Sequence, residues 1–435
     1  MPDPVRIEKM IYGGLGIAGE GTREVAAPFV LPGELIKLNH HGEINILEPS
    51  PDRIAPTCIH FGSCGGCHYQ HASYPAQIAI KTAVLRDTLT AAGITEVPEI
   101  LPIFAEPFGY RNRIRLRVGE VVSNEGSEVC VGYNRRDASG GDALLPITMC
   151  PIAAPLLWRA AETLVSLTKT DPLVTLWMKA SVELELFTSG DEKKLQMTLF
   201  IRKPVKADFN TFCSVVRKHL PELSGAGIAI LPTKPSQRGR RSERAKPGAQ
   251  WGSAGMMYSV NAEDYWVSRG SFFQVNRFLV SELAALVVAG RNGNLAWDLY
   301  TGVGLFTRGL MKNFSQVIAV EAAESAAADL AGALKRTPHR AVAMTTLDFL
   351  QATVVQRERP DLIVMDPPRA GVGDDVCALL LRVNAPELVY VSCDPVTLAR
   401  DLAQLIDGGY KLQSLNMVDM FPQTYHQETV AVLVR

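Results

Sequence analysis

The stretch that decides the fold is Asp298-Leu299-Tyr300-Thr301-Gly302-Val303-Gly304-Leu305-Phe306. It continues an apolar run, Leu295 to Leu299, and its two glycines predict a tight turn that opens a helix. A second apolar run, Gln316 to Val320, leads into Glu321, about 20 residues after the turn, where Rossmann-type sites place an acid to accept hydrogen bonds from ribose hydroxyls. The two features together indicate a cofactor that carries a nucleoside.

Working outward, the same texture of apolar strands and helical segments extends from about residue 270 to the end. Three further strands are predicted at Leu362 to Met365, Leu388 to Val391 and Val430 to Val434. Such alternation predicts a doubly wound parallel sheet, with its ligand crevice at the carboxyl ends of the strands. Because the turn lacks a full G-x-G-x-x-G, a cofactor without pyrophosphate fits it better, and S-adenosylmethionine is favoured over NAD.

The rest of the chain differs from this part. Residues from about 5 to 48 contain short β-type runs separated by glycines, the pattern of a small barrel. A helix is predicted from about Tyr74 to Ala92, ending at Gly93, and the runs between about 100 and 260 are mostly strand-like. We therefore expect a multi-domain protein with a β-barrel over 1–52, an α+β domain over 53–262 and an α/β domain over 263–435.

Composition limits the functional classes. The 435 residues are 47% hydrophobic and 20% charged, as in folded globular proteins. We see neither a signal peptide nor 18 consecutive apolar residues, so a cytoplasmic protein without membrane spans is expected. In that compartment its eight cysteines stay reduced, which favours metal binding or catalysis over disulfides. A net charge of −1 implies that any nucleic-acid surface is local.

Two basic segments are candidates for such a surface. Arg111, Arg113, Arg115 and Arg117 alternate with other residues at the period of a strand, so their side chains are expected to share one face. The alternative is a solvated strand face, but the absence of an interleaved acid favours phosphate contact. The second segment, from Thr233 to Gly248, has the composition of a loop and is interpreted as solvated, with RNA contact as the alternative.

Cys393 is the candidate nucleophile. It follows the strand predicted at 388–391 and precedes Asp394 and Pro395, which places it on the same rim as Asp366 and Glu321. Methylation of carbon 5 of uracil requires a thiolate to add at carbon 6, and a general base to remove the carbon 5 proton afterwards. The usual alternative for a cysteine is a buried small hydrophobe, which is our interpretation of the three at positions 130, 213 and 377.

Four other cysteines form a candidate metal site. Cys58, Cys64 and Cys67 lie within one segment, and Cys150 precedes a proline much later. Four thiolates suit a zinc ion or an iron–sulfur cluster about equally, and the spacing does not separate them. Cys130 is the alternative fourth ligand.

A resemblance sharpens these interpretations. The segments FFQVN, DLYTGVGLF, DPPRAG, VSCDP with TLARD, and DMFPQTYHQE resemble, in the same order, the RNA 5-methyluridine methyltransferase family, of the 23S rRNA (uracil-5-)-methyltransferase type. The resemblance spans most of the chain. It implies an N-terminal TRAM barrel, which is OB-like and binds RNA, a central domain with an iron–sulfur cluster, and a Rossmann-like class I methyltransferase domain.

The resemblance also implies roles for single residues. Cys393 becomes the nucleophile and Glu428 the base, whereas the local sequence leaves Glu428 and His426 as equal candidates for that base. The cofactor, S-adenosyl-L-methionine, is contacted by Gln274, Tyr300, Glu321 and Asp366. A [4Fe-4S] cluster is bound by Cys58, Cys64, Cys67 and Cys150. The implied partner is RNA, with ribosomal RNA preferred to transfer RNA, and we expect a monomer.

Three rival functions fit the sequence less well. RNA cytosine-5 methylation uses a second cysteine after the aspartate, where this chain has Pro367-Pro368-Arg369. Methylation of the adenine amino group leaves Cys393 without a role. A non-catalytic RNA-binding or iron–sulfur protein on the same fold is disfavoured, because both Cys393 and Glu428 are present.

Overall fold

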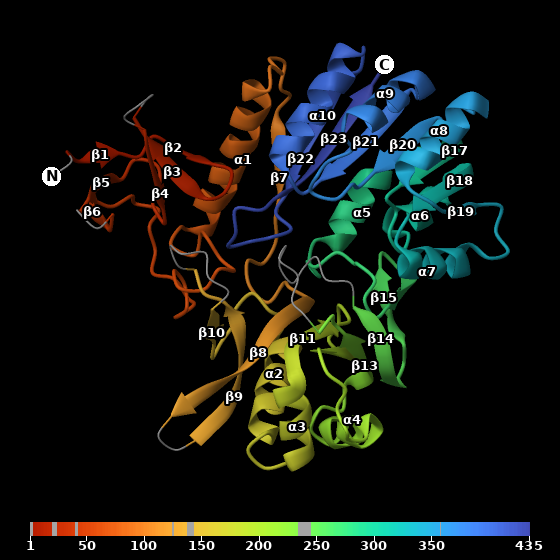
Figure 1. The fold of residues 1–435 in the computed structure, drawn as a ribbon. Helices are drawn as coiled ribbons and strands as arrows, with labels where there is room; N and C mark the ends of the chain where they lie inside the picture. The colour runs from red at the N-terminus through yellow and green to blue at the C-terminus, as the bar shows by residue number, and fades with distance from the viewer. Residues whose placement is uncertain are drawn as a thin grey trace. The chain divides into compact units, whose positions relative to one another are not determined.

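The computed structural model describes residues 3–19, 24–39, 42–123, 126–136, 143–233, 245–356 and 358–435. These residues form two compact units. The first unit contains residues up to 57, from 67 to 107, and from 279 to 435, and the second contains 58–66 and 108–278. Figure 1 shows the elements of both. Most of the basic segment from Thr233 to Gly248 lies outside the described residues.

The first unit begins with short antiparallel strands, as the glycine-separated runs predict. They form two three-stranded sheets, β1-β5-β6 and β2-β3-β4, around a small core that includes Ile7, Val30 and Ile36. The strands are β1 (Val5–Arg6), β2 (Lys9–Ile11), β3 (Leu15–Ala18), β4 (Val25–Pro28), β5 (Leu35–Leu38) and β6 (Ile44–Glu48). Glu34 is fully buried here and accepts a 2.6 Å hydrogen bond from Arg53.

The main sheet of the first unit has eight strands in the order β19-β18-β17-β20-β21-β23-β22-β7. The strands are β7 (Ile100–Ile103), β17 (Gly293–Leu299), β18 (Phe314–Glu321), β19 (Arg340–Ala343), β20 (Leu362–Met365), β21 (Glu387–Ser392), β22 (Lys411–Val418) and β23 (Glu428–Val434). Five strands, β17 to β21, are parallel, which confirms the predicted doubly wound core. The prediction of a wholly parallel sheet is wrong, because β23 runs antiparallel to both β21 and β22.

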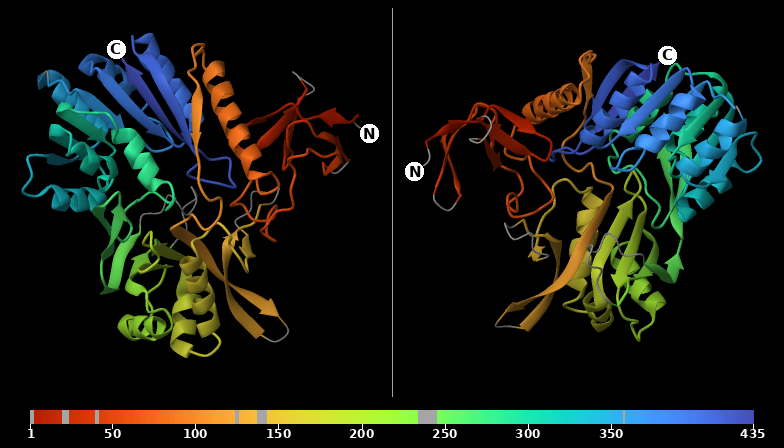
Figure 2. Two further views of the ribbon diagram at one scale, coloured as in Figure 1. Left: turned by 180° about the vertical axis from the view of Figure 1, so that it is seen from behind. Right: turned by 45° about the horizontal axis from the view of Figure 1, so that its top comes forward.

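Helices alternate with these strands. They are α1 (Tyr74–Ala91), α5 (Val280–Val288), α6 (Leu305–Leu310), α7 (Glu324–Leu334), α8 (Thr346–Gln356), α9 (Asp374–Val383) and α10 (Pro395–Asp407). The helix predicted from Tyr74 is confirmed, and it begins there because Ser73 caps it and a proline occupies its first turn. α1 packs against α10, β7 and β2 (Figure 2). Residues 67–107 therefore belong to the same compact unit as residues 279–435.

The second unit is the α+β structure expected for the middle of the chain. Its seven-stranded sheet, β10-β9-β8-β11-β12-β13-β14, is antiparallel except between β12 and β13. Its elements are β8 (Arg113–Ser123), β9 (Gly126–Asn134), β10 (Leu144–Pro146), α2 (Pro155–Leu167), α3 (Pro172–Ala180), β11 (Ser181–Thr188), β12 (Leu195–Ile201), α4 (Phe209–His219), β13 (Leu223–Ile230), β14 (Lys246–Gly252) and the hairpin β15 (Gly255–Val260) with β16 (Glu263–Ser268). Its core includes Leu116, Leu157, Leu186 and Phe212.

Candidate active site

Four predicted site residues lie at one edge of the main sheet. Tyr300, Asp366 and Cys393 directly follow β17, β20 and β21, and Glu321 is the last residue of β18. These strands are parallel, so their carboxyl ends share the edge at which doubly wound sheets bind ligands. Gln274, the remaining residue predicted to contact the cofactor, lies in the second unit, where it is buried. Its cofactor role stays a prediction.

The glycine turn after β17 is hydrogen-bonded to Glu321. Its carboxylate accepts hydrogen bonds from the backbone N–H of Gly302, at 2.8 Å, and of Ala323, at 2.6 Å. Tyr300, with φ of 60°, and Gly304, with φ of 93°, adopt left-handed conformations. Such a conformation is strained for tyrosine and persists only where the surroundings enforce it. The acid that the sequence assigned to a ribose thus also fixes the shape of the turn.

Asp298, in β17 just before this turn, is a further acid, and the sequence predicted no role for it. It is fully buried and accepts hydrogen bonds from the hydroxyls of Thr301, at 2.6 Å, and Thr307, at 2.5 Å. Burial raises the pKa of its carboxyl to about 6. The signal was present in the sequence, since an acid inside an otherwise apolar strand needs local partners.

Glu428 is brought beside Cys393 by the register of antiparallel strands. Ser392, at the end of β21, pairs with Thr429 in β23, so the next position on each strand places Cys393 opposite Glu428. The proximity is reflected in their electrostatics, because Glu428 is one of the groups that raise the pKa of Cys393. The residues predicted as nucleophile and base therefore meet, although 35 positions in the sequence separate 393 from 428.

Glu428 is a buried carboxyl with little compensation. Its side chain is 2% exposed, and its Oε1 atom has no hydrogen-bond partner among the described residues. Burial, followed by repulsion from Asp366, holds its pKa well above the usual range, and Arg369 acts in the opposite direction. A carboxyl with a raised pKa has the higher proton affinity that a general base needs.

Cys393 is a half-buried thiol whose charged form is disfavoured. Burial raises its pKa to about 12, and the acids Glu428 and Asp366 add to the increase. Arg369 is the one described group among these causes that lowers it. Arg369 also lies 3.3 Å from the Nε2 atom of His426, so this exposed guanidinium is the cation of the site.

Asp394, next to Cys393, has a structural role that explains the motif Cys-Asp-Pro. Its carboxylate caps α10 by accepting from the backbone N–H of Val396, at 3.0 Å, and Thr397, at 3.1 Å. The cap fixes the chain direction directly after the nucleophile. Tyr12 reaches the same place from the β2–β3 turn, with its hydroxyl 3.5 Å from the carbonyl oxygen of Cys393.

The loop between β22 and β23, which leads to Glu428, is fastened by α1. Lys81 donates to Asp419 at 2.5 Å and to the carbonyl of Phe421 at 3.0 Å, and both charged side chains are buried. Gln77 forms two hydrogen bonds with Gln423, each of 3.0 Å. Local sequence gives no hint of these contacts, because they join residues about 340 positions apart.

The arginine stripe in the second unit has intramolecular partners. The guanidinium of Arg113 lies 4.0 Å from the ring centre of Phe187 and donates to the carbonyl of Ser271. Arg115 lies 3.8 Å from the ring centre of Phe200 and donates to Glu183 at 2.7 Å. Arg113 and Arg115 are therefore packed against neighbouring side chains, and phosphate contact by the stripe stays a prediction.

Three of the four predicted cluster cysteines belong to the second unit and interact electrostatically. Cys58 is one of the groups that raise the pKa of Cys64, and Cys64 is one of those that raise the pKa of Cys150, which burial brings to about 11. Cys67 belongs to the first unit. Within the described ranges, no three histidine, cysteine, aspartate or glutamate side chains are grouped closely enough to hold a metal ion. The arrangement thus shows interacting thiols and not a formed metal site.

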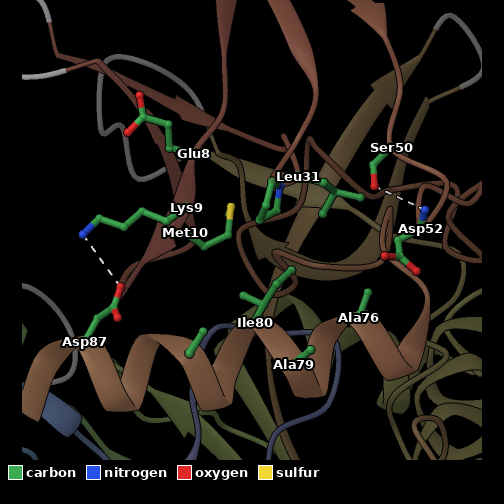
Figure 3. A pocket seen from close by; sticks show the side chains of 12 residues that line it. Glu8, Lys9, Met10, Leu31, Ser50, Asp52, Ala76, Ala79, Ile80 and Asp87 are labelled. Atoms are coloured by element: carbon green, nitrogen blue, oxygen red, sulfur yellow. Dashed lines mark hydrogen bonds and ion pairs between the residues drawn. The ribbon is translucent and has the colours of Figure 1, made fainter.

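A cavity of about 330 Å³ lies elsewhere in the first unit, between α1 and the N-terminal strands (Figure 3). Met10, Leu31 and Ile80 line its apolar part, and Lys9 forms an ion pair with Asp87 at 3.7 Å on its rim. None of the residues predicted for catalysis or cofactor binding lines it. In the part of the chain that the structure describes, no helix has the length and hydropathy needed to cross a membrane.

The chain is similar to known RNA methyltransferases. Residues 260–435 match the family described as tRNA (Uracil-5-)-methyltransferase. The chain is 29% identical over 466 residues to a 23S rRNA (uracil(1939)-C(5))-methyltransferase RlmD from Alkalilimnicola ehrlichii, covering 100% of this chain and 97% of that protein. It is 28% identical to an uncharacterized RNA methyltransferase from Thermotoga maritima, with coverage of 100% and 99%.

The fold has a counterpart among solved structures. The Pyrococcus abyssi tRNA (uracil-54, C5)-methyltransferase, determined with S-adenosyl-L-homocysteine, superposes with a TM-score of 0.75 at 22% identity. The match covers 99% of this chain and 100% of that one. At this identity the likeness establishes the fold, which is shared along the whole chain.

Proposed function

We propose that the chain, whose residues 260–435 match the tRNA (Uracil-5-)-methyltransferase family, transfers a methyl group from S-adenosylmethionine to carbon 5 of a uridine in RNA. The observation that carries the proposal is the pairing of Cys393 with the buried acid Glu428 at the ligand-binding edge of the sheet. An adenine amino group or a simple binding role needs neither residue.

The two residues divide the reaction between them. The Cys393 sulfur bonds to carbon 6 of the uracil, and the electron pair of the carbon 5–carbon 6 double bond moves into an enolate. When bound, S-adenosylmethionine supplies an electrophilic methyl group, which carbon 5 takes up. Glu428 then accepts the remaining carbon 5 proton, the double bond re-forms, and the bond from carbon 6 to sulfur breaks to release Cys393.

The raised pKa values fit this division. Cys393 must lose its proton before it attacks, and Arg369 is placed to stabilise the thiolate. Glu428 must bind a proton late in the reaction, which burial favours. His426, the other candidate base, is the neighbour of Arg369 in this arrangement. That contact supports the glutamate as the base.

The cofactor is proposed to lie along the rim formed by Tyr300, Glu321 and Asp366, with Gln274 as a further contact. The strained turn at Tyr300 and the open space beside Gly302 leave backbone accessible to a ligand. The proposal also includes an RNA-binding barrel of TRAM type over residues 1–52, a central domain over 53–262 and a methyltransferase domain over 263–435. The enzyme is expected to act as a monomer in the cytoplasm.

Ribosomal RNA is the preferred substrate class. Full-length relatives at 29% identity are named as 23S rRNA (uracil(1939)-C(5))-methyltransferases. Transfer RNA is the alternative, because the structural counterpart with a TM-score of 0.75 is named for uracil-54 of tRNA.

The mechanism is tested with two variants that fail at different steps. Cys393→Ala is expected to form no covalent adduct with RNA, whereas Glu428→Gln methylates once and then accumulates a protein–RNA adduct, because the carbon 5 proton cannot leave. The measurement is a denaturing gel with a radiolabelled methyl donor, and His426→Ala serves as the matched control. Normal turnover by Glu428→Gln, with an adduct trapped by His426→Ala, means that the base is misassigned.

We also propose that Cys58, Cys64, Cys67 and Cys150 bind a [4Fe-4S] cluster. The support is the set of four thiols and the electrostatic contact among three of them. Because the described side chains do not form a closed site, no catalytic step is assigned to the cluster.

The cluster proposal predicts about four irons per chain in protein purified without oxygen, with brown colour. Cys150→Ser is expected to lose iron, and Cys130→Ser is the matched control that keeps it. Zinc in place of iron contradicts the cluster, and loss of iron only in Cys130→Ser contradicts the choice of Cys150.

A further inference from the structure

Four aromatic rings gather beside Cys393 from three separate segments of the first unit. Tyr12 comes from the β2–β3 turn, His68 from the segment before α1, and Tyr425 and His426 from the loop before β23. We call these four residues the aromatic cluster. Tyr425 is its centre, with ring-centre distances of 5.2 Å to Tyr12, 4.4 Å to His68 and 4.1 Å to His426.

The rings of the aromatic cluster meet edge-on or tilted, and not as parallel stacks. The planes of Tyr12 and Tyr425 are at 87°, those of His68 and Tyr425 at 66°, and those of Tyr425 and His426 at 50°. All four residues are half-buried, so each keeps part of its surface exposed. In a crossed pair, the ring that presents its edge keeps both π faces free for a planar ligand, whereas each ring of a parallel stack loses one.

The aromatic cluster adjoins the reacting groups. The hydroxyl of Tyr12 is 3.5 Å from the carbonyl oxygen of Cys393, and His426 precedes Glu428 by two positions. On its other side, His426 lies 3.3 Å from the exposed guanidinium of Arg369. A planar ligand on these rings is therefore next to both a cation and the nucleophile.

The barrel approaches the aromatic cluster with a residue that leaves room for it. A Cβ atom added at Gly14 would lie 3.4 Å from both His68 and Tyr425, and Gly14 has φ of 82°. The β2–β3 turn can thus come close to the rings and direct Tyr12 toward Cys393. This position connects the barrel to the reaction centre through a side chain.

We propose that the aromatic cluster stacks the unpaired bases next to the target uridine, while Arg369 contacts the phosphate that links the uridine to these bases. Unpaired RNA bases are typically recognised by stacking on aromatic side chains, with cationic groups along the backbone. The proposal rests on the proposed function and assigns a substrate-binding role to residues outside the cofactor rim. The alternative is that the rings only fasten the barrel to the catalytic part.

The test uses a short single-stranded RNA that carries one uridine flanked by the fluorescent base 2-aminopurine. Stacking on the rings is expected to quench its fluorescence. Tyr12→Leu removes the ring and keeps apolar volume, so it should weaken binding about tenfold and reduce the quenching. Tyr12→Phe keeps the ring and should bind as the parent does. Phe104→Leu is the matched control, because it removes a ring that is 54% exposed outside the aromatic cluster.

Each outcome decides between stacking and fastening. Weaker binding with an unchanged melting temperature supports stacking, while a lowered melting temperature with unchanged affinity and quenching overturns it. If Tyr12→Leu does not fold, His68→Leu takes its place with the same expectations. The measurement needs no methyl donor, so a failure of the proposed methylation shows separately, as the absence of 5-methyluridine despite quenching.

Discussion

Asp419 and Glu428 are two buried carboxyls at opposite ends of the loop between β22 and β23, and they differ in how their charge is compensated. Asp419 is fully buried but has the ammonium of Lys81 at 2.5 Å and the hydroxyl of Tyr74 at 2.9 Å. Glu428 is also buried, yet one of its oxygens has no hydrogen-bond partner among the described residues. The charged group with the largest effect on its pKa is another acid, Asp366.

The difference separates an acid that holds the structure from one that reacts. A paired buried acid keeps its charge and fixes the segments around it. An unpaired one costs free energy, which the fold tolerates only where the chemistry needs a proton acceptor. The loop thus has a rigid anchor at its first end and a reactive group at its last.

The largest expected effect comes from breaking the anchor. Lys81→Met leaves Asp419 buried without its cation and should lower the free energy of unfolding by about 3–5 kcal/mol. Lys9→Met breaks the more exposed pair with Asp87 and should cost less than about 1 kcal/mol. Urea denaturation of both variants provides the comparison. Equal losses in the two would show that the buried pair has no special role.

A smaller effect of opposite sign is expected at the reactive end. The pKa of Glu428 is raised in the folded protein, so its ionisation favours the unfolded state and stability falls as pH rises through the folded-state value. Glu428→Gln removes this penalty. The variant should be at least as stable as the parent at pH 5.5, and its advantage should grow at pH 8. A variant less stable at both values would contradict the picture of an unpaired acid.

The smallest expected effect concerns Arg369, the cation shared by the reactive groups. Arg369→Ala removes a charge that lowers the pKa of Cys393, so the thiolate fraction at pH 8 should fall. Alkylation of Cys393 by iodoacetamide, followed by peptide mass spectrometry, is expected to slow several-fold, and Arg369→Lys should largely preserve the rate. An unchanged rate in Arg369→Ala would remove the arginine from the account of nucleophile activation.

The sequence predicted the parts of the fold that are encoded locally. Apolar runs located β17, β18, β20, β21 and β23, and the helix predicted from about Tyr74 to Ala92 is α1. β22 was missed because polar residues interrupt its apolar ones, and its place in the sheet depends on pairing with β23 and β7. The antiparallel direction of β23 follows from the same hairpin, which periodicity does not reveal.

The residues of the candidate site also divide into those that the local sequence reveals and those that it does not. Cys393 was identifiable because it directly follows an apolar strand, whereas Glu428 was chosen over His426 only through a family resemblance. The burial of Glu428 arises when β23 enters between β21 and β22, far from any local signal. The intramolecular contacts of the arginine stripe were hidden from the sequence for a related reason, since Glu183 and Phe187 lie on the neighbouring strand β11.

The edge strand β7 has a consequence for how the chain folds during synthesis. Its residues 100–103 pair with 415–418, so their partner is made only after the whole second unit has been translated. The second unit is continuous apart from residues 58–66 and has its own core, which allows it to fold first. α1 and β7 reach their final packing only later, because such long-range pairing forms slowly. Until the last strands leave the ribosome, Ile78, Leu85 and Leu89 of α1 lack most of the core into which they pack.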